Sequence, residues 1–264
     1  SQPGMFANAN YYLVLRDRDD NTSTLRGIVN AFSEVGIIDN LKYKISLNAD
    51  LSSDKNDAWV PSEANGGMFS APPNPAWGNY YNGNTQNWLI ENILTWNKTI
   101  ANDHNVDVLL GYTTQKSTTE WSRINASDYP DDEVYWFNAA TTKVGQGDRG
   151  QWAMISYLGR LNYDFKERYL LSLSFRRDGC SRFGSEAKFA NFPSVAAGWI
   201  AADEAFLKKY DWLSYLKVRA SWGKVGNYNI GNYNHLSTIG SANYVFNGGI
   251  TPGRAQGAIG NSNL

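Results

Sequence analysis

Two aromatic-rich stretches are the strongest candidates for ligand chemistry in this sequence. Flat rings present apolar faces that suit the C–H faces of sugars, and the Asn and Asp residues near them could bond hydroxyl groups. The same rings could instead pack loops together or lie at the surface of a bilayer. The candidates for substrate contact are Trp59, Trp77, Tyr80, Tyr81, Trp121, Trp136 and Phe137.

No combination of residues points to catalysis. The acidic runs at Asp19–Asp20 and Asp131–Glu133 are most simply solvated turns. His104 and His235 stand far apart, and no Cys or His joins either at ligand spacing, so we expect no metal site and no cofactor. We therefore expect a protein that binds a ligand and is not an enzyme.

Composition leaves the membrane question open but excludes several classes of protein. The 264 residues carry a formal net charge of −1 and no basic run, so nucleic acid is not an expected partner. The mean hydropathy is −0.47 and 42% of residues are hydrophobic, which is typical of soluble domains. Transmembrane β-strands look similar, because only every second residue faces lipid. The high aromatic content, 14%, is consistent with interfacial girdles.

Strand-length pieces of the stretch from 159 to 222 alternate between apolar and polar residues. An apolar outer face and a wet lumen produce this two-residue period in a membrane barrel. The expected lipid-facing set is Leu161, Tyr163, Phe165, Leu171, Leu173, Phe175, Leu216, Val218, Ala220 and Trp222. The opposite set is Arg160, Asn162, Asp164, Ser172, Ser174, Arg176, Lys217, Arg219 and Ser221.

The pattern predicts about nine strands, at 9–17, 24–35, 41–53, 85–100, 105–119, 151–165, 168–178, 192–202 and 215–225. Short connections at 36–40, 101–104 and 166–167, and a medium one at 203–214, alternate with long or polar ones. The long ones are 18–23, 54–84, 120–150, 179–191 and 226–264. Outer-membrane barrels have short periplasmic turns and long extracellular loops. The alternation therefore predicts an antiparallel meander and assigns a side to each connection.

Five pieces of the sequence, in this order, also match a known family. They are GRLNYDFKERYLLSLSFRRDG, SRFG, FPSVAAGW, FLKKYDWLSYLKVRASWGKVGN and YVFNGGITPG. They resemble the C-terminal barrel of the SusC/RagA-type TonB-dependent transporters of Bacteroidota outer membranes. Cys180 departs from the pattern, since a second Ser is usual before the SRFG piece.

The resemblance implies an all-β fold: an antiparallel meander within a large transmembrane β-barrel that has long extracellular loops. Residues 1–264 would then be part of a barrel domain, without the plug, TonB box, signal peptide and closing strands. Two outer strands without partners would make the piece a curved, open sheet. By the resemblance, the family imports glycans or peptides too large for porins, and we expect a nutrient importer whose substrate is a glycan or oligosaccharide. Its partners are a SusD-like surface lipoprotein, the TonB–ExbB–ExbD complex and outer-membrane lipid.

Two other functions remain open at this stage. A soluble, aromatic-rich carbohydrate-binding β domain would bury the apolar face against a second sheet. A passive porin-like channel would lack a plug. The polar residues that we expect to face a lumen could contact substrate, but more often such groups bond to a plug or to one another across the lumen. They are Arg160, Arg176, Lys217 and Arg219.

Overall fold

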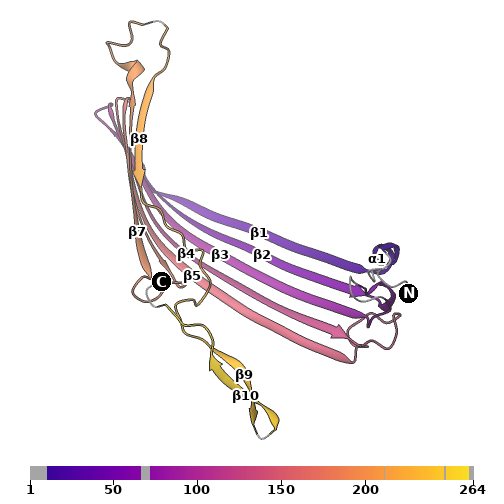
Figure 1. The fold of residues 1–264 in the computed structure, drawn as a ribbon. Coiled ribbons are helices and arrows are strands. Elements are labelled where there is room, and N and C mark those ends of the chain that lie inside the picture. The colour runs from indigo at the N-terminus through magenta and orange to yellow at the C-terminus, as the bar shows by residue number, and fades with distance from the viewer. Residues whose placement is uncertain (1–10, 67–71, 211, 247, 262–264) are drawn as a thin grey trace. The chain divides into compact units, whose positions relative to one another are not determined.

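The structure, a computed structural model, describes residues 11–66, 72–210, 212–246 and 248–261. It is almost entirely β (Figure 1). Among the described residues, eight strands form one antiparallel meander in chain order, and two more form a separate hairpin. The strands are β1 Asp19–Ile38, β2 Leu41–Val60, β3 Trp77–Ile100, β4 His104–Ser127, β5 Thr142–Phe165, β6 Tyr169–Cys180, β7 Phe189–Ile200, β8 Lys217–Gly223, β9 Ile239–Phe246 and β10 Gly249–Gln256. Short helical segments are α1 Tyr11–Asp17, η1 Ser62–Ala64 and η2 Ala201–Asp203.

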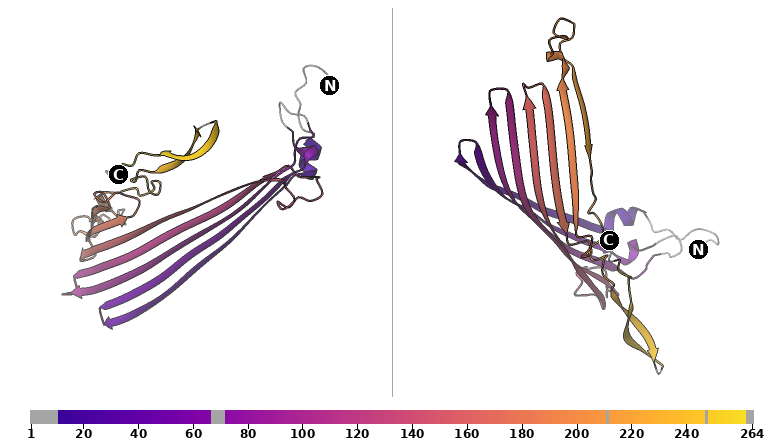
Figure 2. Two further views of the ribbon diagram at one scale, coloured as in Figure 1. Left: turned by 90° about the horizontal axis from the view of Figure 1, so that it is seen from below. Right: turned by 90° about the vertical axis from the view of Figure 1, so that its left-hand side faces the viewer.

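The chain divides into two compact units. One contains Ser1–Ile28, Ala49–Asn87 and Ser117–Gln151, and the other contains Val29–Asn48, Trp88–Lys116 and Trp152–Leu264. In the second unit, strands β5 to β8 lie side by side in a single layer (Figure 2). Among the described residues, β1 and β8 are the edges of the eight-stranded sheet, as expected for an open piece of a barrel.

The turn between β5 and β6 fixes the register of the second unit. Lys166 and Glu167 both adopt positive φ angles, 54° and 56°, and the Arg168 N–H donates to the Phe165 carbonyl at 3.0 Å, so residues 166–168 form a tight hairpin turn. Phe165 therefore pairs with Tyr169, and Leu161 pairs with Leu173 further along. Because side chains alternate between faces, this register puts Leu161, Tyr163, Phe165, Leu171, Leu173 and Phe175 on one side.

The first unit has a small core of its own. Tyr80, Ala126 and Ala140 are buried, and Ile124, Tyr129 and Phe137 pack against them. The Tyr80 ring makes edge contacts with Trp136 and Phe137, each 5.2 Å away between ring centroids. The connection between β4 and β5 therefore packs onto the strands and does not extend from them as a free loop.

The predicted strand at 9–17 is wrong, because residues 11–17 form helix α1; residues 9 and 10 lie outside the described part. Tyr11 to Leu15 is a continuous apolar run without a two-residue period, so it gave no real strand signal. The predicted connection at 18–23 is also wrong, since β1 begins at Asp19. Asn56 of β2 donates hydrogen bonds to Asp20 and Thr22, which extends the pairing into this polar stretch.

The long connections are shorter than predicted. Only residues 61–76 and 128–141 separate β2 from β3 and β4 from β5, and the predicted loop at 226–264 contains the β9–β10 hairpin. Cross-strand polar pairs explain the difference. Asn79 bonds Asn125 at 2.6 Å, and Arg149 pairs with Glu120 at 2.8 Å. Their side chains support the strands, whereas in the sequence their polarity indicated loops.

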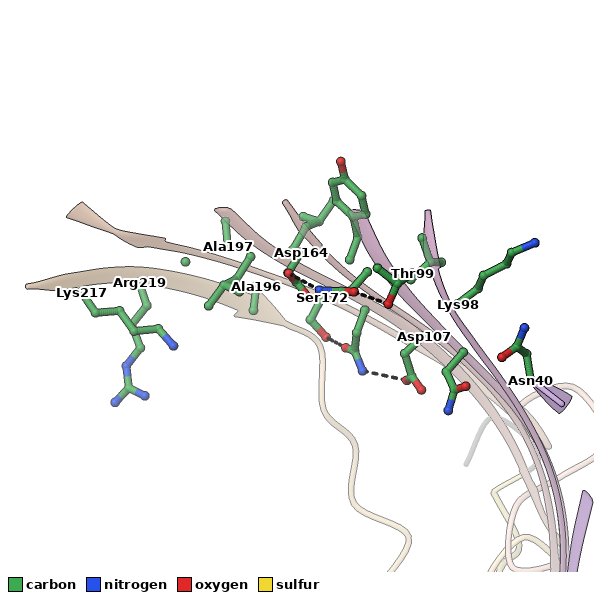
Figure 3. Close-up of a pocket in the computed structure, with 18 residues that line it drawn as sticks. Asn40, Lys98, Thr99, Asp107, Asp164, Ser172, Ala196, Ala197, Lys217 and Arg219 are labelled. Atoms are coloured by element: carbon green, nitrogen blue, oxygen red, sulfur yellow. Dashed lines mark hydrogen bonds between the residues drawn. The ribbon is translucent and has the colours of Figure 1, made fainter. Parts of the chain in front are cut away.

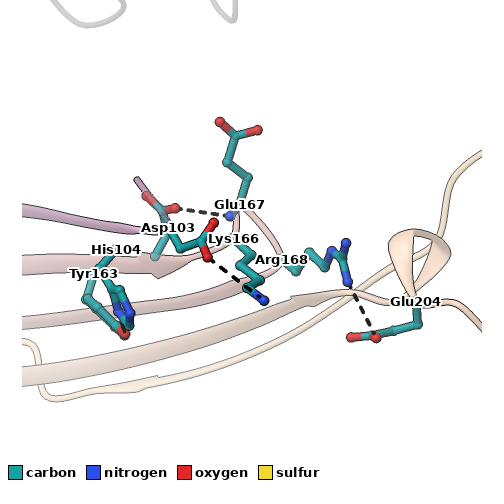
Figure 4. A network of polar contacts seen from close by, with 8 residues as sticks. Asp103, His104, Tyr163, Lys166, Glu167, Arg168 and Glu204 are labelled. Atoms are coloured by element: carbon teal, nitrogen blue, oxygen red, sulfur yellow. Dashed lines mark hydrogen bonds and ion pairs between the residues drawn. The ribbon is translucent and has the colours of Figure 1, made fainter. Parts of the chain in front are cut away.

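Glu204 fastens the connection after β7 to the sheet (Figure 4). Its carboxylate accepts hydrogen bonds from the Tyr169 hydroxyl at 2.5 Å and the Trp199 indole at 3.2 Å, and Arg168 lies 3.8 Å away. The hydrogen bond from Tyr169, then that from Trp199 and the nearby cations Arg168 and Lys208, lower the pKa of this carboxyl group.

This depressed pKa predicts a pH-dependent contribution to stability. A carboxyl group whose pKa is lower in the folded state stabilises the fold above its ordinary pKa of 4.5, and the contribution is lost as the pH falls through the folded value. We expect Glu204→Gln to lower the unfolding midpoint of the full-length protein at pH 7, and the difference to shrink at pH 4. Denaturant titrations at both pH values measure this. Glu186→Gln, on the β6–β7 connection, controls for the loss of one negative charge, and an unchanged difference at pH 4 contradicts the assignment.

Candidate functional site

The register of the second unit collects polar side chains on one face of the sheet. Along three neighbouring strands, Asn162 pairs with Ser172 and Ser172 with Ala196, while Arg160 pairs with Ser174 and Ser174 with Ser194. Pairs of residues that lie opposite each other share a face. We call this the polar face. All four residues expected to face a lumen, Arg160, Arg176, Lys217 and Arg219, lie on it.

Hydrogen bonds connect the polar side chains across strands (Figure 3). In one row, Ser172 of β6 donates to Asn162 of β5 at 2.7 Å, and Asn162 donates to Asp107 of β4 at 3.2 Å. In the next row, Thr99 of β3 donates to Asn105 at 2.6 Å, and Asn105 donates to Asp164 at 3.0 Å.

The hydrogen bonds in such a row hold each polar side chain in a fixed position on the polar face. They also give each of these side chains a partner, so that none is buried unpaired. Asp107 was not among the sequence candidates. Its polar position within an alternating strand was the signal that could have identified it.

A hollow of about 600 Å³ lies against these rows. Lys98, Lys217 and Arg219 line it together with the carboxylates Asp107 and Asp164. Figure 3 shows Lys217 and Arg219 extending from β8 on the same side of the sheet as Asp107. Within the described part of the chain, the side chains of Lys217 and Arg219 have no hydrogen bond or ion pair. Their cationic groups are therefore available to a ligand or to another polypeptide.

The opposite face of the unit is apolar and uncovered. Leu171, Leu173 and Val218 are 36%, 38% and 54% exposed, although they lie in the middle of regular strands. The soluble-domain alternative requires this face to be buried against a second sheet. No such layer covers it in the part of the chain that the structure describes.

Aromatic residues border this apolar face at two levels. On the level nearest the short turns are Tyr163, Phe165, Tyr169 and Trp199, and on the other level are Tyr112, Tyr157 and Phe175. Aliphatic residues lie between them. On β5 and β6 the two levels are six to eight residues apart, about 20 to 27 Å at about 3.4 Å per residue. Strands of outer-membrane barrels are tilted by about 35–45°, so this length corresponds to a height of about 14 to 22 Å, a little less than the apolar band of about 25 Å between two aromatic girdles.

The seven aromatic candidates for ligand contact do not form one group. Trp59, Trp77, Tyr80, Tyr81 and Trp121 lie in strands, and only Trp136 and Phe137 lie in a connection. Tyr80 and Tyr81 are successive residues of β3, so they point to opposite faces.

The ring contacts divide the candidates further. Trp59 and Tyr80 are 8% exposed and pack on other rings of the chain. Tyr81 and Trp121 stack at 6.3 Å, with the Arg123 guanidinium 5.5 Å and 5.9 Å from their rings. Ligand contact at any of the seven stays a prediction.

Comparison with known proteins gives relatives of one kind. TonB-dependent receptor P39 of Formosa agariphila is 35% identical over 150 residues, and TonB-dependent receptor P26 of the same organism is 34% identical over 185. These matches cover 56% and 69% of this chain. TonB-dependent receptor SusC of Bacteroides thetaiotaomicron is 47% identical over 79 residues, 30% of the chain. This chain is a homologue of part of the TonB-dependent receptors.

Solved structures support the same fold for this receptor segment. The RagAB peptide transporter superposes with a TM-score of 0.85 over 96% of the chain, at 22% sequence identity. The RagAB peptide importer in its open-open state gives 0.83 over 96%. The segment spans 14%, 19% and 8% of the lengths of P39, P26 and SusC, and 28% of the first RagAB chain. No family model matches it, and no helix among the described residues is long and apolar enough to cross a bilayer.

Two adjacent alanines test the assignment of the faces. Ala197 pairs with Leu171 on the apolar face, and Ala196 pairs with Ser172 on the polar face. We expect Ala197→Lys to cost about 2–4 kcal/mol, the cost of a lysine at the bilayer midplane, and Ala196→Lys to cost little. Denaturant unfolding of the full-length receptor from lipid bilayers measures both. Equal costs for the two variants contradict a lipid-facing Ala197.

Proposed function

We propose that this chain forms part of the barrel wall of an outer-membrane TonB-dependent importer of nutrients. The observation that carries the proposal is the contrast between the two faces of β4 to β8. One face is aliphatic, exposed and bordered by aromatic rings, and the other is a hydrogen-bonded polar wall. Lipid contacts the first face, and the second lines the path of the substrate. The names of the relatives, all of them receptors or transporters, support binding and gated passage and not catalysis.

The substrate that we propose is a glycan or oligosaccharide. Tyr81 and Trp121, with Arg123 beside them, supply apolar ring faces next to hydrogen-bond donors, and Asn79 and Asn125 lie nearby on the same two strands. Flat faces with a few placed polar groups suit sugars. The RagAB structures are those of a peptide transporter, so peptides are the second candidate.

The proposed partners follow from the same assignment. A SusD-like surface lipoprotein would cover the end of the barrel that carries the long connections, and the TonB–ExbB–ExbD complex would supply energy through parts of the receptor outside this chain. Lys217 and Arg219, whose charges have no partner in the described chain, are suited to contact a plug inside the barrel. The protein would reside in the outer membrane.

Energy-dependent uptake is the direct test of this function. Cells that lack the full-length receptor should lose uptake of its oligosaccharide, and the intact gene should restore it. A protonophore should abolish the restored uptake, whereas a passive channel would continue to conduct. We expect Trp121→Ala to weaken substrate binding about fivefold, the equivalent of about 1 kcal/mol for one lost ring contact.

Trp212→Ala is the matched control for that variant. Trp212 is 79% exposed in the connection between β7 and β8, at the end of the sheet that carries the short turns. Substrate affinity should stay unchanged in this variant. Uptake that persists with the protonophore would contradict the importer, and an equal loss in both tryptophan variants would contradict ring contact at Trp121.

Sidedness gives an independent prediction. The connection at 61–76 should be extracellular and the turn at 39–40 periplasmic. In the full-length receptor with Cys180 replaced, a cysteine introduced at Gly66 should react with a membrane-impermeant maleimide on intact cells. A cysteine at Asn40 should react only after the cells are opened. Labelling of Asn40 but not of Gly66 on intact cells would reverse the topology.

A further inference from the structure

The segment that follows β8 folds back over the polar face of β5 to β7. The Lys224 backbone N–H donates to the Pro193 carbonyl at 3.0 Å, which continues the pairing one residue beyond β8. The chain then passes against Phe192, where a Cβ at position 226 would lie 2.4 Å from the ring, so a residue larger than Gly would require the ring to move. The Tyr228 ring reaches Trp152 of β5, with ring centroids 5.5 Å apart.

Arg182, in the turn after β6, holds this segment in place. Its guanidinium donates to the Asn232 side chain at 2.8 Å and to the Tyr228 carbonyl at 3.2 Å. It also lies over the Trp152 ring at 4.9 Å and the Tyr228 ring at 5.8 Å. A planar guanidinium that stacks and donates hydrogen bonds at once fixes both partners, which lysine could not do. These contacts hold residues 224–232 in place over the polar face. We call this segment the inward fold.

A pocket of about 600 Å³ remains between this inward fold and the sheet. Most of its wall is apolar, formed by Met154, Phe183, Ala187, Ala190, Phe192, Val225 and Tyr228. Its charged residues are Arg176, Asp178, Lys188 and Lys224. Arg176 and Asp178 neutralise each other at 2.7 Å. Lys188 and Lys224 have no hydrogen bond or ion pair to their ammonium groups within the described residues, so the pocket carries an excess of positive charge.

We propose that this pocket binds a ligand group that joins an apolar portion to a carboxylate or similar anion. Apolar walls with a few convergent polar groups are the usual composition of small-molecule sites. An anion between two uncompensated ammonium groups gains charge-assisted hydrogen bonds. The apolar portion of the ligand covers the apolar wall of the pocket and so removes both surfaces from water. The inference rests on the proposed function in one respect: it makes the pocket a subsite for part of the imported ligand. An acidic sugar derivative and a peptide carboxylate share this chemistry.

Cys180 provides a reporter inside the pocket. It lines the wall, is 3% exposed, and is the single cysteine of the chain. In the purified full-length receptor, with any cysteine outside this chain replaced, the uncharged reagent methyl methanethiosulfonate should modify Cys180 at a rate measurable by mass spectrometry. We expect 3-phenylpropionate to slow this reaction about threefold at twice its Kd. The cation of similar shape, 3-phenylpropylamine, should not slow it.

The double variant Lys188→Gln, Lys224→Gln should lose the protection by 3-phenylpropionate and keep the unprotected rate. Lys209→Gln, the same change in the β7–β8 connection, should keep the protection. Equal protection by acid and amine, protection that survives in the double variant, or a Cys180 that does not react at all would each overturn the proposal. The assay does not measure transport. One outcome separates the two proposals: uptake persists with the protonophore while 3-phenylpropionate, but not the amine, still protects Cys180. That result would support the pocket as an anion site and contradict only its role in energy-dependent import.

Discussion

Backbone hydrogen bonding between neighbouring strands is the constraint on which the rest of this structure depends. Every buried N–H and C=O needs a partner, and in hydrocarbon only helices and closed sheets supply all of them. Within the described part of the chain, an eight-stranded meander supplies these partners to its inner strands, and its edges are β1 and β8. Pairing of those edges with further strands of the receptor would complete the ladder. The tight turn at Lys166 and Glu167 then sets the register on which each face depends.

The same strand register places apolar side chains on the face toward lipid and polar side chains on the face toward water. A slip of one residue would move Leu171 and Leu173 to the face of Asn162 and Asp107, and would take Ser172 and Arg176 into the apolar band. The cross-strand bonds from Ser172 to Asn162 and on to Asp107 oppose such a slip, because it would break all of them at once. The polar wall therefore has a structural role besides any contact that it makes with substrate.

Strand length separates the part of the sheet that spans a membrane from the rest. A tilted strand crosses a bilayer with about 9–11 residues. β3, β4 and β5 have 24 residues each, while β6 and β7 have 12. The longer strands therefore continue beyond the apolar band. Most of the aromatic candidates lie in these continuations, where strand geometry and not loop flexibility orients their rings. Trp59 and Tyr80 pack within the chain, whereas Tyr81 and Trp121 stack beside Arg123.

The sequence by itself determined the order of β1 to β8 and the division of Arg160 to Trp222 into two faces, because alternation with period two is a local property. The family followed from five matching pieces of sequence. Tertiary structure decided the rest. The extension of β1 to Asp19 depends on a partner distant in sequence, Asn56 for Asp20, and helix α1 contacts η1. The β9–β10 hairpin is local and, among the described residues, pairs only with itself, but the sequence analysis placed no strand there. The inward fold depends on contacts of Arg182 with residues about fifty positions away, and no local pattern encodes such a contact.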